Sequence, residues 1–179
     1  EMIDIEKRYG QHEAVRDLNL YLEKGESVGL LGPNGAGKST TIEILSSLAK
    51  PTSGVVRFKG KPVSQHLQSF RKRIGVVPQE IALFPQLTAE ENLLFFGQIY
   101  NLAKKEVKKR VDELLELVGL TDRRKDKVKT FSGGMKRRLN TAAALVHRPE
   151  FLLMDEPTVG IDPQSRRHIL DLVKTLQTN

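Results

Sequence analysis

The sequence predicts an α/β fold in which a long helical stretch is inserted into a sheet-containing core. Three compact apolar runs, at 27–31, 74–77 and 151–154, have the composition of parallel strands that are covered on both faces. Segments with helical periodicity separate these runs, and such interleaving is typical of an α/β sheet. The stretch 88–147 carries helical patterns throughout, so we expect it to be an insertion on the sheet.

The length and composition indicate a single globular domain. The chain has 179 residues, of which 39% are hydrophobic and 28% charged, as expected of one ordinary domain with its own core. The absence of cysteine excludes disulfides, cysteine-ligated metal centres and thiol nucleophiles. No apolar run approaches the roughly 18 residues of a membrane helix, and the first residues do not form a signal peptide. We therefore expect a cytoplasmic chain.

Two further strands are predicted from alternation and from bracketing glycines. Leu18, Leu20 and Leu22 alternate with polar or amphipathic neighbours, which is the pattern of a half-buried strand. The run 55–58 lies between two glycines and is expected to form another short strand.

Four helices are expected after residue 87. The first begins at Thr88, because Thr88 and Glu91 have the spacing of a capping box. The second spans about 105–118, with apolar residues at helical spacing and a glycine directly after it. The third helix is expected to follow Ser132 and to end before Pro149. The fourth is expected to have Asp162 as its N-cap and Pro163 at its first helical position.

A phosphate-binding loop follows the first apolar run. Residues 32–39 match G-x-x-x-x-G-K-[ST] and precede a helical pattern at 41–48. The glycines let backbone N–H groups approach phosphate oxygens, with the helix dipole behind them. An ordinary glycine-rich turn is the alternative, but the flanking strand and helix favour a nucleoside triphosphate site. Its expected binding residues are Gly32, Pro33, Asn34, Gly35, Ala36, Gly37, Lys38, Ser39 and Thr40.

Three side chains of this loop have separate expected roles. Lys38 would reach the β- and γ-phosphates, Ser39 would ligate Mg²⁺, and Thr40 would contact the α-phosphate.

Two acids follow the last apolar run directly, at the edge where parallel sheets bind ligands. Asp155 is expected to help hold Mg²⁺, and Glu156 to accept a proton from water that attacks the γ-phosphate. An acidic helix or turn cap is the alternative interpretation.

The run 131–135 precedes a helix and offers a hydroxyl and backbone N–H groups as a second anion site. A serine with two glycines is a weak signal alone, but the order of motifs is specific. The phosphate loop, then Gln79 after a strand, then Ser-Gly-Gly, then Asp-Glu resembles the ATP-binding domain of ABC (ATP-binding cassette) proteins over essentially the whole chain.

The resemblance implies further roles. Tyr9 would stack on adenine, and Gln79 would sense Mg²⁺ and the attacking water. Ser132, Gly133 and Gly134 would bind the γ-phosphate held by a second cassette. The metal residues would be Ser39, Gln79 and Asp155; the catalytic residues would be Glu156, Gln79 and Lys38; and 159–162 would be the D-loop.

The family fold is a P-loop NTPase (RecA-like) core with a small antiparallel β subdomain and an inserted α-helical subdomain. By that resemblance the core and β subdomain comprise 1–80 and 148–179, and the helical subdomain comprises 81–147. ATP and Mg²⁺ are the implied cofactors. The implied partners are a second ATP-binding domain, identical or not, in a head-to-tail dimer, and an integral membrane permease subunit.

The sequence departs from the family pattern in two places. Phe131 and Met135 stand where leucine and glutamine are usual, a variant similar to the ATPases of ABC-2 type exporters. The family's switch histidine lies on a strand beyond the last helix, and the chain ends at Asn179 before it. We therefore expect a C-terminally incomplete domain that binds Mg-ATP and hydrolyses it weakly.

Two functions are compatible with these motifs. The first is an ATPase subunit, peripheral on the inner face of the cell membrane, that powers transport through a separate permease, with export as the expected direction; the region 82–100 would dock on the permease. The alternative is a soluble ABC ATPase that acts on nucleic acid or ribosomes. Only 53 positions separate Gln79 from Ser132, which leaves no room for a long coiled-coil arm, so nucleic acid is not the expected partner.

The positive charge is concentrated in one segment. The chain has 29 Lys and Arg against 22 Asp and Glu, a net charge of +7, and 104–138 alone holds 13 basic and 6 acidic residues. Most of this segment is expected to form solvated faces or to lie near anionic headgroups. Lys136, Arg137 and Arg138 directly follow the second anion site, where their charge would favour a neighbouring triphosphate.

Overall fold

The computed structural model describes residues 1–177. The chain separates into two compact units, of which unit 1 is Glu1–Ile74 and unit 2 begins at Gly75. The predicted division into a core with its β subdomain and a helical subdomain at 81–147 stays a prediction.

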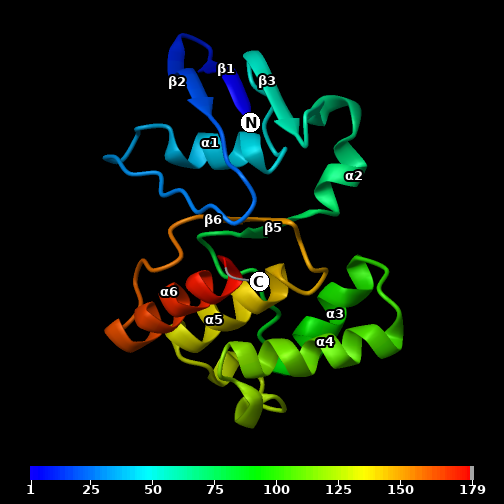
Figure 1. The fold of residues 1–179 in the computed structure, drawn as a ribbon. Helices are drawn as coiled ribbons and strands as arrows, with labels where there is room; N and C mark the ends of the chain where they lie inside the picture. The colour runs from blue at the N-terminus through cyan, green and yellow to red at the C-terminus, as the bar shows by residue number, and fades with distance from the viewer. Residues whose placement is uncertain (178–179) are drawn as a thin grey trace. The chain divides into compact units, whose positions relative to one another are not determined.

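Unit 1 is built on a four-stranded antiparallel sheet with the order β2-β1-β3-β4 (Figure 1). A hairpin of β1 (Met2–Tyr9) and β2 (His12–Leu20) turns at Gly10, whose φ of 61° suits a residue without a side chain. The sheet is completed by β3 (Ser53–Phe58) and β4 (Lys61–Pro62). The predicted strands near Leu18 and at 55–58 are therefore confirmed, although β2 ends before Leu22.

The helices of unit 1 are short and supply part of its core. They are α1 (Lys38–Leu45), the 3₁₀ turn η1 (Val63–Gln65) and α2 (Leu67–Arg71). The buried apolar residues of this unit come from the sheet, from these helices and from the end of the unit, and are Met2, Ile5, Val15, Ile44, Leu45, Val63, Phe70 and Ile74. Because Ile44 and Leu45 are buried, the C-terminal half of α1 fixes this helix in unit 1, and with it the position of the helix start.

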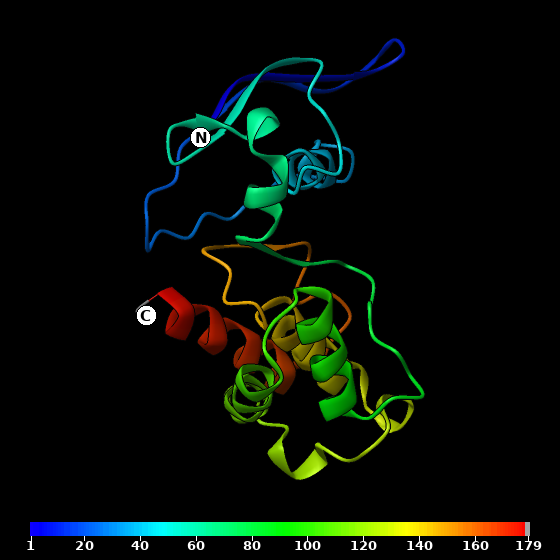
Figure 2. The same ribbon diagram turned by 90° about the vertical axis from the view of Figure 1, so that its right-hand side faces the viewer.

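Unit 2 combines two paired strands with four helices. The strands are β5 (Ile74–Val77, whose first residue belongs to unit 1) and β6 (Phe151–Met154). The helices are α3 (Ala89–Ile99), α4 (Lys104–Leu117), α5 (Gly133–Ala144) and α6 (Pro163–Gln177), with 3₁₀ turns η2 (Thr121–Arg123) and η3 (Val128–Thr130) between α4 and α5. Figures 1 and 2 show α5 (yellow) and α6 (orange to red) side by side.

The predicted helix signals act as expected in unit 2. Thr88 and Glu91 form a complete capping box at the start of α3. The predicted helix at 105–118 is α4, and Gly119 adopts a φ of 63° directly after its C-cap. The two further predicted starts are confirmed, with Ser132 capping α5 and Pro163 beginning α6, while α5 ends at Ala144, before Pro149.

One predicted strand is wrong. Residues 27–31 form neither helix nor strand, and the side chain of Leu31 is 96% exposed. Apolar composition alone secured neither burial nor a strand here, because a strand also needs a neighbour for its backbone N–H and C=O groups. The four strands described in unit 1 pair with one another and not with this run. Within residues 1–177, none of the helices is long and apolar enough to cross a bilayer.

Candidate functional site

The phosphate loop of unit 1 depends on two glycines with left-handed backbone. Gly35 and Gly37 have φ values of 83° and 81°. A Cβ on Gly37 would lie 2.4 Å from the carbonyl oxygen of Ala14, so both the backbone angle and the close approach require glycine there. Gly37 is also the N-cap of α1 and has no side chain to occupy the first N–H groups of the helix. The loop therefore leads into a helix start that is suited to an anion.

Lys38 is held against its own loop. Its Nζ donates to the carbonyl oxygens of Gly32 at 2.8 Å and Pro33 at 2.9 Å. The first turn of α1 contains no acidic residue, so the helix itself places no carboxylate against an anion at its start. The lysine, the glycine turns and the helix N-terminus all favour a bound anion, such as the phosphate groups of a triphosphate. Ser39 lies in the same turn and is exposed, which suits a hydroxyl ligand for Mg²⁺.

Tyr9 ends β1 with its side chain 49% exposed. Lys7 Nζ lies 4.8 Å from the centre of the ring, and the hydroxyl donates to Glu43 Oε2 at 3.5 Å. The ring is thus accessible and already bears a cation–π contact on one face. Stacking of Tyr9 on adenine stays a prediction.

In unit 2 the structure brings Gln79 and Glu156 together. Gln79 Nε2 donates to Glu156 Oε2 at 2.9 Å. Each residue lies two positions beyond the end of its strand, β5 or β6. The backbone N–H of Asp155 donates to the carbonyl of Val77 at 2.9 Å, which places the two strand ends beside each other. The pairing of the strands therefore explains the contact between the side chains.

Glu156 has an unusual backbone for a residue with a side chain. Its φ is 45°, in the left-handed region that non-glycine residues rarely adopt. Such strain is common where a structure aims a functional side chain. A carboxylate has about four acceptor sites, so the bond from Gln79 leaves Glu156 able to accept a proton from water.

The second predicted anion site begins α5. Ser132 is its N-cap, and the Oγ accepts a hydrogen bond from the N–H of Met135 at 3.2 Å. Gly134 lies so close to α6 that a Cβ would be 1.9 Å from Ser165 Oγ, whereas a Cβ on Gly133 would meet nothing within 4 Å. The first glycine therefore leaves the helix start open, and the second permits close packing on the start of α6.

The start of α6 is capped by Asp162. Its Oδ1 accepts from the backbone N–H of Ser165 at 2.8 Å, and this bond holds the pKa of the Asp162 carboxyl below its usual range. The N-cap role predicted for Asp162 is confirmed.

Two residues of α5 have contacts that the sequence did not predict; Asn140 was not a candidate, and Arg137 was expected to act through its charge at the second anion site. Arg137 and Asn140 are buried, and both bond to the segment that carries Gln79. The sequence gives little signal for them, because α5 also carries Lys136, Arg138 and Thr141, and only the structure shows which of its polar side chains are buried against another segment.

Two arginines of the basic segment bond within unit 2, whereas most of its lysines are exposed, as expected of solvated faces. Arg137 and Arg138 were expected to place charge beside the second anion site, but both donate inward to backbone carbonyls. Arg138 Nη1 bonds to Val118 and Gly119 at the end of α4. Helix ends leave carbonyls without partners, so a nearby arginine satisfies them. That expectation was therefore wrong for these two residues.

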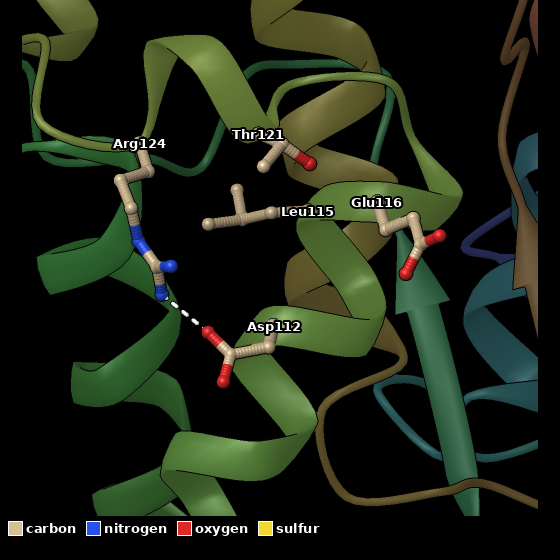
Figure 3. Close-up of a pocket in the computed structure, with 5 residues that line it drawn as sticks. All are labelled: Asp112, Leu115, Glu116, Thr121 and Arg124. Atoms are coloured by element: carbon tan, nitrogen blue, oxygen red, sulfur yellow. Dashed lines mark hydrogen bonds and ion pairs between the residues drawn. The ribbon is translucent and has the colours of Figure 1, made fainter.

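A pocket of about 360 Å³ lies beside α4, and Figure 3 shows its five lining residues, Asp112, Leu115, Glu116, Thr121 and Arg124. Arg124 donates to Asp112 at its rim and also bonds to Glu90 of α3. The pKa of Arg124 is raised above its ordinary value, chiefly by the bond to Asp112. The arginine thus links η2, α3 and α4, and no predicted site residue lines this pocket.

An exposed aromatic pair lies in the region predicted to dock on a permease. Phe84 and Phe95 meet edge to face, with ring centres 4.6 Å apart and side chains 44% and 37% exposed. The buried amide of Asn92 accepts from the N–H of Phe84 at 2.8 Å and donates to its carbonyl at 3.1 Å. The loop that carries Phe84 is therefore fixed to α3 while the rings face solvent.

The comparisons with known proteins agree with these features. The family described as "ABC transporter" matches residues 15–159. The linearmycin resistance ATP-binding protein LnrL of Bacillus subtilis (strain 168) is 58% identical over 173 residues, which is 97% of this chain and 56% of that protein. The Nod factor export ATP-binding protein I of Cupriavidus metallidurans is 44% identical over 176 residues, which is 98% of this chain and 58% of that protein.

A solved structure supports the same assignment. The dimeric post-hydrolysis state of the ATP-binding cassette MJ0796, bound to ADP and Pi, superposes with a TM-score of 0.84 at 32% identity and covers 98% of this chain and 82% of that chain. The predicted fold class, a P-loop NTPase with an antiparallel β subdomain, is thereby confirmed. The chain spans a little over half the length of the two curated relatives, 56% and 58%. On this evidence of family, sequence and fold, the chain belongs to the ABC transporter family, as an ATP-binding domain.

Proposed function

We propose that the chain is the nucleotide-binding part of an ATPase subunit that powers export through a separate membrane permease. The observation that carries the proposal is the bond from Gln79 Nε2 to Glu156 Oε2 at 2.9 Å, beyond the adjacent ends of β5 and β6. An acid next to a polar amide at such a strand edge suits the activation of water. The names of the two relatives, a resistance ATP-binding protein and an export ATP-binding protein, support export.

Nucleotide binding is assigned to the phosphate loop and to α1. Backbone N–H groups at the start of α1 would donate hydrogen bonds to phosphate oxygens. Lys38 would give up its hydrogen bonds to the two loop carbonyls and bind the β- and γ-phosphates instead. Thr40 would contact the α-phosphate, and Tyr9 would stack on the base. Ser132, Gly133 and Gly134 are assigned to the γ-phosphate of a nucleotide that a second domain holds, because the start of α5 is open at Gly133.

Mg²⁺ is the proposed metal. When bound, it would neutralise charge on the phosphate oxygens. Ser39, Gln79 and Asp155 offer hydroxyl, amide and carboxylate oxygens, the donor types that Mg²⁺ prefers. Each is assigned as a metal residue, directly or through water.

Hydrolysis is assigned to Glu156 as general base. Its carboxylate would take a proton from the attacking water while Gln79 holds the carboxylate in orientation. General-base catalysis contributes typically ~10²- to 10⁴-fold in rate. The left-handed backbone of Glu156, with a φ of 45°, is uncommon for a non-glycine residue, which supports a role that requires one particular orientation.

Two partners are proposed, a second ATP-binding domain in a head-to-tail dimer and a membrane permease. The dimeric state of MJ0796 supports the first. The exposed pair Phe84 and Phe95 supports the second, since aromatic side chains are enriched at protein interfaces. Arg124, Arg137 and Arg138 of the basic segment bond within unit 2, so these three arginines lend no support to the nucleic-acid alternative.

The test uses the full-length protein purified with its membrane partner and reconstituted in vesicles. ATP is supplied with Mg²⁺ or with a chelator, and phosphate release is measured beside movement of a candidate substrate. We expect Mg²⁺-dependent phosphate release that rises with transport. Phosphate release that proceeds equally in the chelator, or that responds to nucleic acid but not to the permease, would contradict the proposal.

A further inference from the structure

The segment that carries Gln79 is held by contacts from another element. Residues 78–82 form neither helix nor strand, so no ladder of backbone bonds fixes their conformation. Two side chains of α5 bond to this segment instead. Arg137 Nη1 donates to the carbonyl oxygens of Pro78 at 3.1 Å and Gln79 at 2.6 Å, and Asn140 Oδ1 accepts from the N–H of Ala82 at 3.1 Å.

These two side chains act from one helix face. Positions three apart lie next to each other on a helix, so Arg137 and Asn140 reach the two ends of the same short segment. They are 7% and 3% exposed. Hydrogen bonds from an ionised donor are stronger than neutral ones, and burial shields them from water. We call this pair of contacts the α5 clamp.

The α5 clamp acts on the residue that contacts Glu156. The carbonyl of Gln79 accepts from Arg137, while its side-chain amide donates to Glu156 Oε2. Because the clamp holds the backbone from which that amide projects, it also determines where the amide meets the carboxylate.

We propose that Arg137, with Asn140, is a positioning residue for ATP hydrolysis that keeps Gln79 in register with Glu156. The inference rests on the proposed ATPase function and extends it to the interior of α5. The same helix begins at the second anion site, Ser132 to Gly134, so the clamp lies one turn beyond it. An anion that engages the start of α5 would thereby act on the helix that holds Gln79.

The test compares two neighbouring arginines of α5 in the full-length protein. Arg137→Met keeps the apolar stem and removes the donors to Pro78 and Gln79. Arg138→Met is the matched control, because Arg138 Nη1 also donates to two carbonyls, but at the end of α4. Displacing a catalytic group by about 1 Å can cost about 10²-fold, so we expect Arg137→Met to lower kcat by roughly 10- to 100-fold with KM unchanged. Arg138→Met should retain kcat.

A double-mutant cycle separates positioning from a general loss of structure. If Arg137 acts through Gln79, adding Arg137→Met to Gln79→Ala should lower kcat no further, because the two changes remove one interaction. Multiplicative losses, or equal losses for Arg137→Met and Arg138→Met, would overturn the inference. Where Arg137→Met does not fold, Arg137→Lys takes its place in the cycle, and we expect its kcat to lie between those of the wild type and Gln79→Ala.

The same series distinguishes failure of the inference from failure of the proposed function. Normal turnover in Gln79→Ala and Glu156→Gln would refute the proposed hydrolytic site itself. Slow turnover in both of those variants with normal turnover in Arg137→Met would refute the α5 clamp alone.

Discussion

Gln79 donates a hydrogen bond to Glu156 over 2.9 Å, although 77 positions separate them in the chain. The pairing of β5 with β6 accounts for the contact, because each residue follows the end of one strand by two positions. A polar amide and a strained glutamate are thus brought to one sheet edge by backbone structure, before any ligand is considered.

Lys38→Ala is predicted to weaken ATP binding. A hydrogen bond to a charged group contributes about 1.5–3 kcal/mol, so the dissociation constant should rise roughly 10- to 100-fold. Titration calorimetry with ATP measures the change, and Lys24→Ala is the control, since Lys24 is exposed in the same unit outside the loop. Equal affinity in the wild type and Lys38→Ala would remove this lysine from the nucleotide site.

Gly134→Ala is predicted to destabilise unit 2, because the new Cβ would lie 1.9 Å from Ser165 Oγ. Overpacking of this kind costs about 1–3 kcal/mol. Urea unfolding measures the loss. Gly133→Ala is the matched control, because its Cβ meets nothing within 4 Å and should not lower stability. The close packing of α5 on α6 would be disproved if both variants unfolded at the same urea concentration.

Glu91→Gln is predicted to lower thermal stability in a pH-dependent way. The bond that Glu91 accepts from the backbone N–H of Thr88 at 2.8 Å, with further help from the Thr88 hydroxyl, holds the pKa of Glu91 below its ordinary value. A lowered pKa in the folded state means that the stabilisation is present above the unfolded pKa of about 4.3 and is lost as pH falls through the folded pKa.

The measurement is the melting temperature of the wild type and Glu91→Gln between neutral pH and pH 3. Glutamine can complete a capping box without charge, so the difference reports the ionised carboxylate. The wild type should melt higher at neutral pH, and the two curves should converge on acidification. A difference that stays constant with pH would contradict the assigned cause.

The double variant Phe84→Ser, Phe95→Ser is predicted to weaken association with the permease while leaving ATP binding unchanged. The two rings are exposed in contact with each other, and truncation of an aromatic anchor at an interface typically costs more than 1 kcal/mol. Co-purification yield of the full-length complex measures the effect. Leu170→Ser on α6 is the control, since Leu170 is an apolar residue that is 50% exposed. Full recovery of the complex with the double variant would place the docking surface elsewhere.

Local signals in the sequence predicted much of unit 2. Thr88 with Glu91, Ser132, and Asp162 with Pro163 each marked a true helix start, because a cap is a contact between residues three or four apart. The pairing of Gln79 with Glu156 was not predicted as a contact. It depends on which strands are neighbours, and a sequence pattern does not specify that.

The errors share one physical origin. Residues 27–31 are apolar enough for a buried strand, but strand formation depends on a hydrogen-bonding partner that is not encoded locally. Arg137 and Arg138 were expected to contribute surface charge near an anion, because composition alone does not show that carbonyls of 78–79 and 118–119 face them. Both errors therefore concern backbone partners distant in the chain: residues 27–31 have no strand partner within the part of the chain that the structure describes, and the two arginines have carbonyl partners that the sequence did not reveal.

The most direct test of the central claim is turnover by Glu156→Gln in the full-length protein with its permease. Phosphate release and ATP affinity are measured together. The control is Glu150→Gln, because Glu150 is a glutamate that directly precedes β6, whereas Glu156 follows it. We predict unchanged ATP affinity and a fall in kcat of at least ~10²-fold for Glu156→Gln, with normal turnover in the control. Near-normal kcat in Glu156→Gln would show that this carboxylate is not the general base, and the proposed hydrolytic site would be wrong.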